Sequence, residues 1–252
     1  MHFVERHEEI LKRLEQEKMV KVIDLSDAFQ VTEKTIRQDL IALEKRGLLK
    51  RIYGGAVLTD NGNILPIAVR QQKYGTEKKS IAKAALSTIK EEDTILLDGG
   101  STIMELAKLL GDFPITVITN DIKIGNLLMN QEKIQLLMLG GLRIPSSTTL
   151  YGPLAKNALE RLRVNRLFLG TTGIDLQHGL TVFNSFHADY KKNIIEVADH
   201  ITLLTDHTKF GQTALIRFAD LQDIDEIITN DELNDRYKKR LNELQLPVVY
   251  SE

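Results

Sequence analysis

The sequence contains no cysteine among its 252 residues. This absence excludes disulfide bonds, thiolate metal sites and thiol nucleophiles, and it is typical of an intracellular protein. The chain also has no run approaching the roughly 18 consecutive apolar residues of a membrane-spanning helix. Its N-terminal segment carries charges throughout and lacks the apolar stretch of a signal peptide. We therefore expect a cytoplasmic protein with no membrane partner.

Sequence motifs for metals and cofactors are missing as well. The six histidines are scattered, and no two of them have the i, i+4 spacing of many zinc sites. Residues 98–102 lack the lysine of a Walker loop, and residues 170–173 lack the third glycine of a dinucleotide fingerprint. No nucleophile elbow is present. We predict no metal, no cofactor and no catalytic residues.

Positive charge is concentrated in one short segment. The formal net charge is -2, so any charge that binds nucleic acid has to be local. Residues 34–51 carry six Lys or Arg against two acids, whereas residues 1–33 carry five against eight. The chain, with 42% hydrophobic residues, is long enough for one large domain and a small one. The basic segment would belong to the small domain.

The N-terminal segment predicts three helices. Apolar residues at helical spacing indicate a helix over about residues 4–17 and a shorter one that ends near residues 30–31. Thr32 is a suitable N-cap for a third helix, with a buried stripe formed by Ile36, Leu40 and Leu43. The opposite face has polar side chains suited to phosphates and base edges, namely Lys34, Thr35, Arg37 and Gln38. This pattern predicts a helix-turn-helix whose third helix enters the major groove of DNA.

A hairpin is expected after the third helix. Gly47 ends that helix, and residues 48–53 and 56–58 flank the turn-forming pair Gly54 and Gly55. The hairpin would form a basic wing, so residues 1–57 are predicted to be a winged helix-turn-helix domain. A single charged helical face is more often merely solvated. The prediction therefore depends on the helices, the turn and the wing occurring together.

Four segments resemble the signature of the DeoR family of bacterial repressors: LSDAF at residues 25–29, TIRQDL at 35–40, LE at 43–44 and RIYGGA at 51–56. The resemblance implies binding to double-stranded operator DNA through Thr32, Lys34, Thr35, Arg37, Gln38, Arg51 and Tyr53. The family commonly has His at the position of Tyr53 and a second Arg at the position of Gln38. We expect the operator preference to differ at the bases that those two positions approach.

The rest of the chain predicts an α/β domain. A turn-rich linker over residues 58–75 precedes it, and the domain itself is expected over residues 76–252. Apolar runs that read as strands buried on both faces of a mainly parallel sheet occur at residues 94–97, 115–118, 134–139, 166–169, 201–204 and 226–228. Segments of helical composition lie between them, at residues 76–90, 101–110, 121–130, 153–162 and 186–198.

Polar residues and glycines follow each predicted strand. In parallel sheets ligands bind beyond the carboxyl ends of the strands, so these segments are expected to share one edge. Residues 98–102 pass from a strand directly into a helix and supply hydroxyls and free amides at its positive end, which suits a phosphate. Each Gly-Gly pair alone is more often only a tight turn. The set of strand ends is what indicates a site for an anionic ligand.

As a set, these strand ends resemble the effector domain of the same family, which is similar in fold to ribose-phosphate isomerases. The resemblance implies a phosphorylated sugar as effector, with its phosphate held by Asp98, Gly100, Ser101 and Thr102. It further implies that Asn120, Gly141 and Gly173 line the site and that Asp206 and Lys209 face the sugar or its phosphate. Lys191 matches a family lysine, which the resemblance implies belongs to the same effector-binding site. The family often has an acid where this chain has His187, and a lone histidine on a helix is more often surface or packing than a ligand.

Together with the resemblance to the family, these features predict a non-enzymatic repressor of a carbohydrate-utilisation operon, acting as a homodimer or homotetramer. One alternative is an isomerase-like enzyme fused to a DNA-binding domain, in which Asp98, Asp206 or His207 acts as a general base. Another is a DNA-binding scaffold that has no ligand and whose glycines only form turns.

Overall fold

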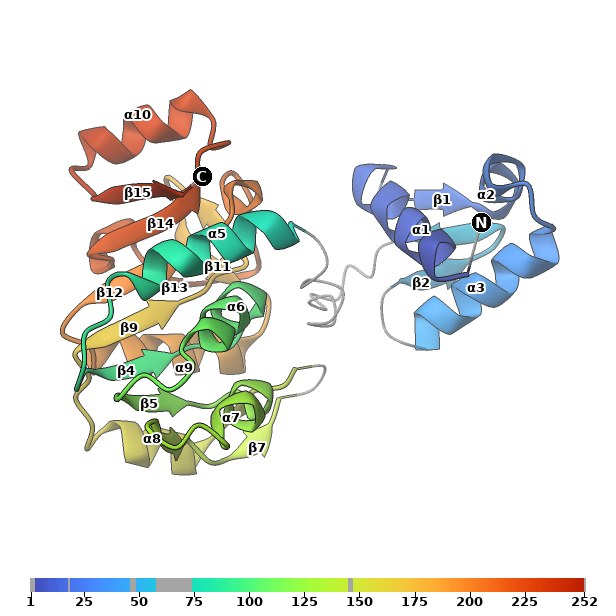
Figure 1. Ribbon diagram of the computed structural model, residues 1–252. Coiled ribbons are helices and arrows are strands. Elements are labelled where there is room, and N and C mark those ends of the chain that lie inside the picture. The colour runs from blue at the N-terminus through green and yellow to red at the C-terminus, as the bar shows by residue number, and fades with distance from the viewer. Residues whose placement is uncertain (1–2, 18, 46–48, 58–73, 145–146, 252) are drawn as a thin grey trace. The chain divides into compact units, whose positions relative to one another are not determined.

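The computed structural model of the chain describes residues 3–17, 19–45, 49–57, 74–144 and 147–251 (Figure 1). The chain divides into two compact units, Met1–Pro66 and Ile67–Glu252. The predicted linker, residues 58–75, lies outside the described residues except for Tyr74 and Gly75.

The N-terminal unit contains the three predicted helices: α1 (Phe3–Glu17), α2 (Val22–Phe29) and α3 (Glu33–Lys45). Gln30 ends α2 in the left-handed region, with φ 53°. The Thr32 hydroxyl accepts a hydrogen bond from the Thr35 amide at 3.2 Å and thus caps α3. Fully buried apolar side chains from the three helices form the core of this unit, among them Ile10, Leu14, Leu25, Ile36, Leu40 and Leu43. The predicted end of α3 at Gly47 lies outside the described residues.

The predicted wing is confirmed as β2 (Lys50–Ile52) paired antiparallel with β3 (Gly55–Val57). Its tip contains Gly54 at φ 77°, a conformation that favours glycine. A third strand, β1 (Met19–Lys21), pairs with β3 on its other side and is absent from the prediction, because three residues are too short to show a period. A Cβ at Gly55 would lie 2.1 Å from the Val20 carbonyl oxygen. Glycine therefore allows β1 and β3 to approach.

The second unit is built on a seven-stranded parallel sheet in the order β15-β14-β12-β9-β4-β5-β6. Six of these strands confirm the predicted runs: β4 (Thr94–Leu97), β5 (Thr116–Thr119), β6 (Gln135–Met138), β9 (Arg166–Leu169), β12 (Ile201–Leu204) and β14 (Glu226–Asn230). The edge strand β15 (Val248–Ser251) is not among the predicted runs. The expectation of burial on both faces is wrong for β6, because it is the other edge strand and Leu137 and Met138 are exposed.

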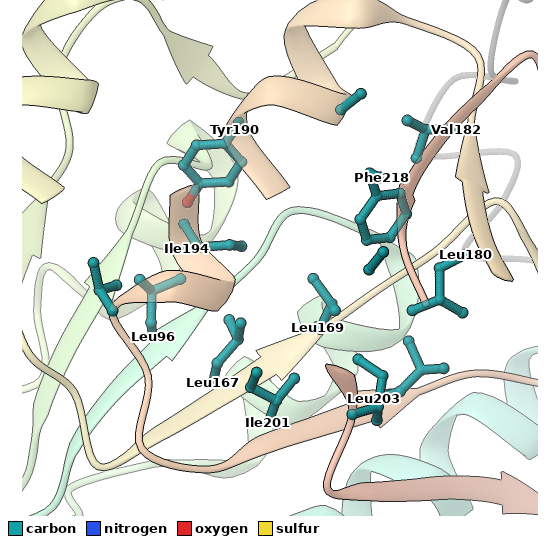
Figure 2. Packing of buried hydrophobic residues seen from close by; sticks show 14 of the residues in the cluster. Leu96, Leu167, Leu169, Leu180, Val182, Tyr190, Ile194, Ile201, Leu203 and Phe218 are labelled. Carbon is teal, nitrogen blue, oxygen red and sulfur yellow. The ribbon is translucent and has the colours of Figure 1, made fainter. Parts of the chain in front are cut away.

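Helices cover both faces of the sheet (Figure 1). On one face lie α5 (Gly75–Leu86), α6 (Ser101–Leu109) and α7 (Ile122–Leu128), and on the other α8 (Pro153–Leu159) and α9 (Ser185–Glu196). Successive side chains of a strand point to opposite faces. Accordingly Ile95 and Leu97 pack with α5, α6 and α7, whereas Leu96 packs in the cluster on the α9 side (Figure 2).

Small elements that the sequence did not predict complete this unit. An antiparallel sheet is formed by β10 (Gly173–Asp175), β11 (Gly179–Val182) and β13 (Ile216–Ala219), and a two-stranded ribbon by β7 (Leu142–Arg143) and β8 (Leu150–Tyr151). The short helices η1 (His207–Lys209) and η2 (Leu221–Asp223) follow strands, and α10 (Asp235–Glu243) precedes β15. The fold class is confirmed: a winged helix-turn-helix unit and a larger α/β unit with a mainly parallel sheet.

Candidate functional sites

The outer face of α3 presents hydrogen-bond donors to solvent. Lys34, Arg37 and Gln38 are exposed, opposite the buried stripe of the same helix. Among the described residues, neither Lys34 nor Gln38 has a side-chain partner. Arg37 forms an ion pair with Glu33 one turn earlier, and its side chain remains 61% exposed. Such an exposed pair stabilises a helix only weakly, so the guanidinium is available to another acceptor.

A buried ion pair fixes the position of α3 against α1. The Arg6 guanidinium donates to the Asp39 carboxylate at 2.6 Å and 3.1 Å, and the two side chains are only 9% and 8% exposed. His7 contacts the same carboxylate at 3.0 Å. The hydrogen bond to Asp39 raises the pKa of Arg6. The sequence did not predict that Asp39 pairs with Arg6. Asp39 was considered there only as an acid within the basic segment of residues 34–51 and as part of the family signature.

The wing contributes one restrained side chain and one exposed side chain. The Glu44 carboxylate accepts hydrogen bonds from the Arg51 amide at 2.8 Å and from its Nε at 2.6 Å. These bonds lower the pKa of Glu44 and fix the Arg51 side chain against the end of α3. Tyr53, at the tip of the wing, is fully exposed.

The centre of the second site lies between β4 and β9. The chain runs outward from β4 to β5 and β6 and then returns to β9 on the other side of β4. Such a reversal of strand order leaves a ligand-binding position at the carboxyl ends of the strands. Asp98 directly follows β4, and Gly170 directly follows β9.

A buried ion pair joins α9 to both strand ends. Asp98 and Lys191 are 2% and 6% exposed, and the Lys191 ammonium donates to the Asp98 carboxylate. That carboxylate also accepts from the amides of Gly99 at 2.8 Å and Gly170 at 3.0 Å, while Lys191 also donates to the Gly170 carbonyl at 2.8 Å. Removing one partner of such a pair leaves an uncompensated buried charge. The hydrogen bond between Lys191 and Asp98 brings together two residues that are 93 positions apart in the sequence.

The N-terminus of α6 adjoins Asp98. Gly100 precedes the helix at φ 151° and supplies no capping side chain. The hydroxyls of Ser101 and Thr102 have no hydrogen-bond partner among the described residues, although these residues are only 6% and 9% exposed. Free amides at a positive helix end, together with unpaired hydroxyls, are suited to a phosphate.

The other predicted site residues differ in the contacts that they make within the protein. Asn120 at the end of β5 donates from Nδ2 to the Leu150 carbonyl at 2.7 Å, and its Oδ1 is buried without a partner in the described part of the chain. Gly141 and Gly173 have structural reasons to be glycine. A Cβ there would lie 2.6 Å from the Tyr151 carbonyl oxygen and 2.3 Å from that of Gln212, respectively.

The loop after β12 contains Asp206 and Lys209. Asp206 is 1% exposed and caps η1, accepting from the amide of Thr208 at 3.1 Å and from its hydroxyl. The ammonium of Lys209 has no ion-pair or hydrogen-bond partner within the described ranges. His187 lies half-buried on α9, and Tyr190 of the same helix, missed from the sequence, is fully buried.

Two family models match the chain, one for each unit. A family model described as "DeoR C terminal sensor domain" matches residues 73–231, and one described as "DeoR-like helix-turn-helix domain" matches residues 6–61. The chain belongs to the DeoR family. It is 36% identical over 250 residues to "Uncharacterized HTH-type transcriptional regulator YulB" of Bacillus subtilis (strain 168), covering 99% of this chain and 97% of the relative.

A second relative of this DeoR-family chain is "Putative aga operon transcriptional repressor" of Escherichia coli O157:H7. It is 36% identical over 231 residues, covering 90% of this chain and 86% of the relative. Among solved structures, ribose 5 phosphate isomerase A from Neisseria gonorrhoeae matches with a TM-score of 0.40 and 18% identity over 53% of this chain and 52% of that chain. The two family models and the relatives identify the DeoR-family protein as a DNA-binding transcriptional regulator with a sensor domain. None of its described helices is long and apolar enough to cross a membrane.

Proposed function

We propose that this protein is a repressor of a carbohydrate-utilisation operon and that a phosphorylated sugar controls its binding to the operator. The observation that carries the proposal is the pair of Ser101 and Thr102 hydroxyls at the start of α6, beside the buried Asp98–Lys191 pair. Neither hydroxyl has a hydrogen-bond partner among the residues that the structure describes. The relatives support it by their names: one is an aga operon repressor, another an L-fucose operon activator from Haemophilus influenzae that is 34% identical over 237 residues.

On the DNA side, we propose that Lys34, Thr35, Arg37 and Gln38 of α3 contact bases and phosphates in the major groove. Thr32 at the cap and Arg51 and Tyr53 of the wing would contact the adjacent backbone. A homodimer or homotetramer would place its recognition helices on half-sites about one helical turn, or a multiple of it, apart. The effector must bind the two states of the protein unequally, because equal affinity would shift nothing.

In the sensor domain, we propose that Gly100, Ser101 and Thr102 hold the phosphate and that Asn120, Asp206 and Lys209 contact the sugar. The ligand would be bound and released unchanged. The contacts of Asp98 favour this reading over isomerase chemistry: its carboxylate accepts hydrogen bonds from Lys191 and from two backbone amides, so it is already engaged by the protein. Product analysis of a sugar phosphate incubated with the protein distinguishes the two.

The test is a titration of the full chain against DNA from its own upstream region, at a fixed salt concentration. It is repeated with a panel of hexose and pentose monophosphates. We expect specific binding that one of these compounds weakens. Specific binding that none of the compounds changes would refute the sugar-phosphate effector and leave the DNA-binding function intact. Turnover of a compound would show an enzyme instead.

A further inference from the structure

Tyr190 lies on α9, one residue before Lys191, and is 2% exposed. Its ring meets that of Tyr151 edge to face, with ring centroids 5.6 Å apart. Figure 2 shows it beside Ile194 in the apolar layer that α9 covers. The hydroxyl, however, is buried and has no hydrogen-bond partner among the described residues. Because an unpaired buried hydroxyl costs free energy, a position that keeps one needs a reason.

The Tyr190 ring contacts that of Tyr151, whose carbonyl oxygen adjoins Gly141 of the candidate effector site. Burial and the charges of Asp98 and Asp121 raise the pKa of Tyr190 well above its ordinary value. The phenol therefore stays protonated at neutral pH and can donate a hydrogen bond. Neither carboxylate is its acceptor. Asp98 bonds to Lys191 and two backbone amides, and Asp121 bonds to the Lys123 amide and the Thr148 hydroxyl.

A complementary group belongs to the same neighbourhood. Asn120 immediately precedes Asp121 and is 0% exposed, and its Oδ1 atom has no partner in the described part of the chain. Its amide nitrogen binds the Leu150 carbonyl, and the next residue, Tyr151, is the one whose ring contacts Tyr190. A buried donor and a buried acceptor, both without a partner in the described ranges, thus lie around β8 and the end of β5.

We propose that the Tyr190 hydroxyl donates a hydrogen bond to an oxygen of the effector's sugar moiety and is a specificity-determining residue of the sensor. This proposal rests on the function proposed above and adds which part of the ligand is read. A sugar hydroxyl can accept from Tyr190 and at the same time donate to Asn120 Oδ1, whereas the oxygens of a phosphate dianion only accept. Tyr190 therefore selects the sugar, and the start of α6 holds the phosphate.

The test compares the full-length wild-type protein with Tyr190→Phe. The probes are inorganic phosphate, a panel of hexose and pentose monophosphates, and deoxy analogues of the compound that binds best. We expect Tyr190→Phe to weaken binding of that compound about 2- to 12-fold, the range of one neutral hydrogen bond. Its affinity for inorganic phosphate and for operator DNA should not change. One deoxy analogue should bind the wild type and the variant equally, because it lacks the oxygen that Tyr190 contacts.

Tyr151→Phe is the matched control. The Tyr151 hydroxyl already bonds to Asn193 Nδ2 at 2.9 Å, so its removal should lower Tm and leave the discrimination between sugar and deoxy sugar unchanged. Tyr190→Phe should keep or raise Tm, because the hydroxyl it removes has no protein partner among the described residues. A fall in Tm for Tyr190→Phe would show a structural role and overturn the proposal.

The two levels of the account fail differently. If the wild type binds a sugar phosphate and Tyr190→Phe binds every compound equally well, the role of Tyr190 alone is refuted. If the wild type binds none of the sugar phosphates, the proposed effector class is refuted, and the role of Tyr190 with it.

Discussion

Replacing Arg37 by Ala tests the assignment of α3 as the recognition helix. The side chain is 61% exposed, and its ion-pair partner among the described residues is Glu33. Loss of such an exposed i, i+4 pair costs only about 0.3–0.5 kcal/mol of stability. Loss of a contact to a base or phosphate costs about 1–3 kcal/mol, which corresponds to about 5- to 150-fold in operator affinity. We therefore expect a large loss of DNA binding with almost unchanged stability and effector affinity.

The matched control is Glu33→Ala, which removes the same ion pair but keeps the Arg37 donor. It should lose as little stability as Arg37→Ala and should not weaken operator binding. Fluorescence anisotropy with labelled operator DNA at one salt concentration measures the operator affinity of both variants, and thermal unfolding measures their stability. If Arg37→Ala binds the operator as tightly as the wild type, the assignment of α3 is refuted. If both variants lose affinity equally, the ion pair matters and not the donor.

Four further changes test other parts of the structure. Thr32→Ala should destabilise the N-terminal unit by about 1 kcal/mol in urea unfolding, because it removes the cap of α3; an unchanged midpoint would contradict this. Asp39→Ala should lower the midpoint in the same assay by more than Thr32→Ala does, because it removes the buried carboxylate to which Arg6 and His7 bond. Thr102→Ala should weaken binding of sugar phosphates in calorimetric titration without changing operator affinity, and an unaltered effector affinity would refute the phosphate site. The raised pKa of Tyr190 predicts stability that is present below about pH 10 and is lost at higher pH, because only the unfolded state releases the proton easily. Tyr190→Phe should lose less stability above pH 10 than the wild type, and equal losses would show that Tyr190 does not contribute.

The sequence predicted the elements whose length reveals their period. The stripe of Ile36, Leu40 and Leu43 spans two turns of α3, and the cap at Thr32 marks where this helix begins. The predicted strands of the central sheet were visible as apolar runs. The order of the strands in the sheet could not be predicted, because an apolar run such as that of β6 has the same composition at the edge of a sheet as in its centre. The exposure of Leu137 and Met138 follows from that position.

The sequence was less informative about contacts between distant segments. Arg6 and Asp39 are separated by 33 positions, and nothing in either local pattern indicates that they pair. The pairing of Asp98 with Lys191 was expected only in so far as the family resemblance assigned both to one site. Tyr190 had no signal, because an aromatic residue in a helical pattern is typical of a core position. Its unpaired hydroxyl is a property of the packed structure.

The central claim is that ligand binding and operator binding are coupled, and coupling is reciprocal. The most direct measurement is therefore the dissociation constant of the bound sugar phosphate for the free protein and for the operator complex. The account predicts that the two constants differ, by the same factor, typically about 5- to 150-fold, by which the sugar phosphate changes operator affinity. Equal constants for the free protein and the complex would contradict it.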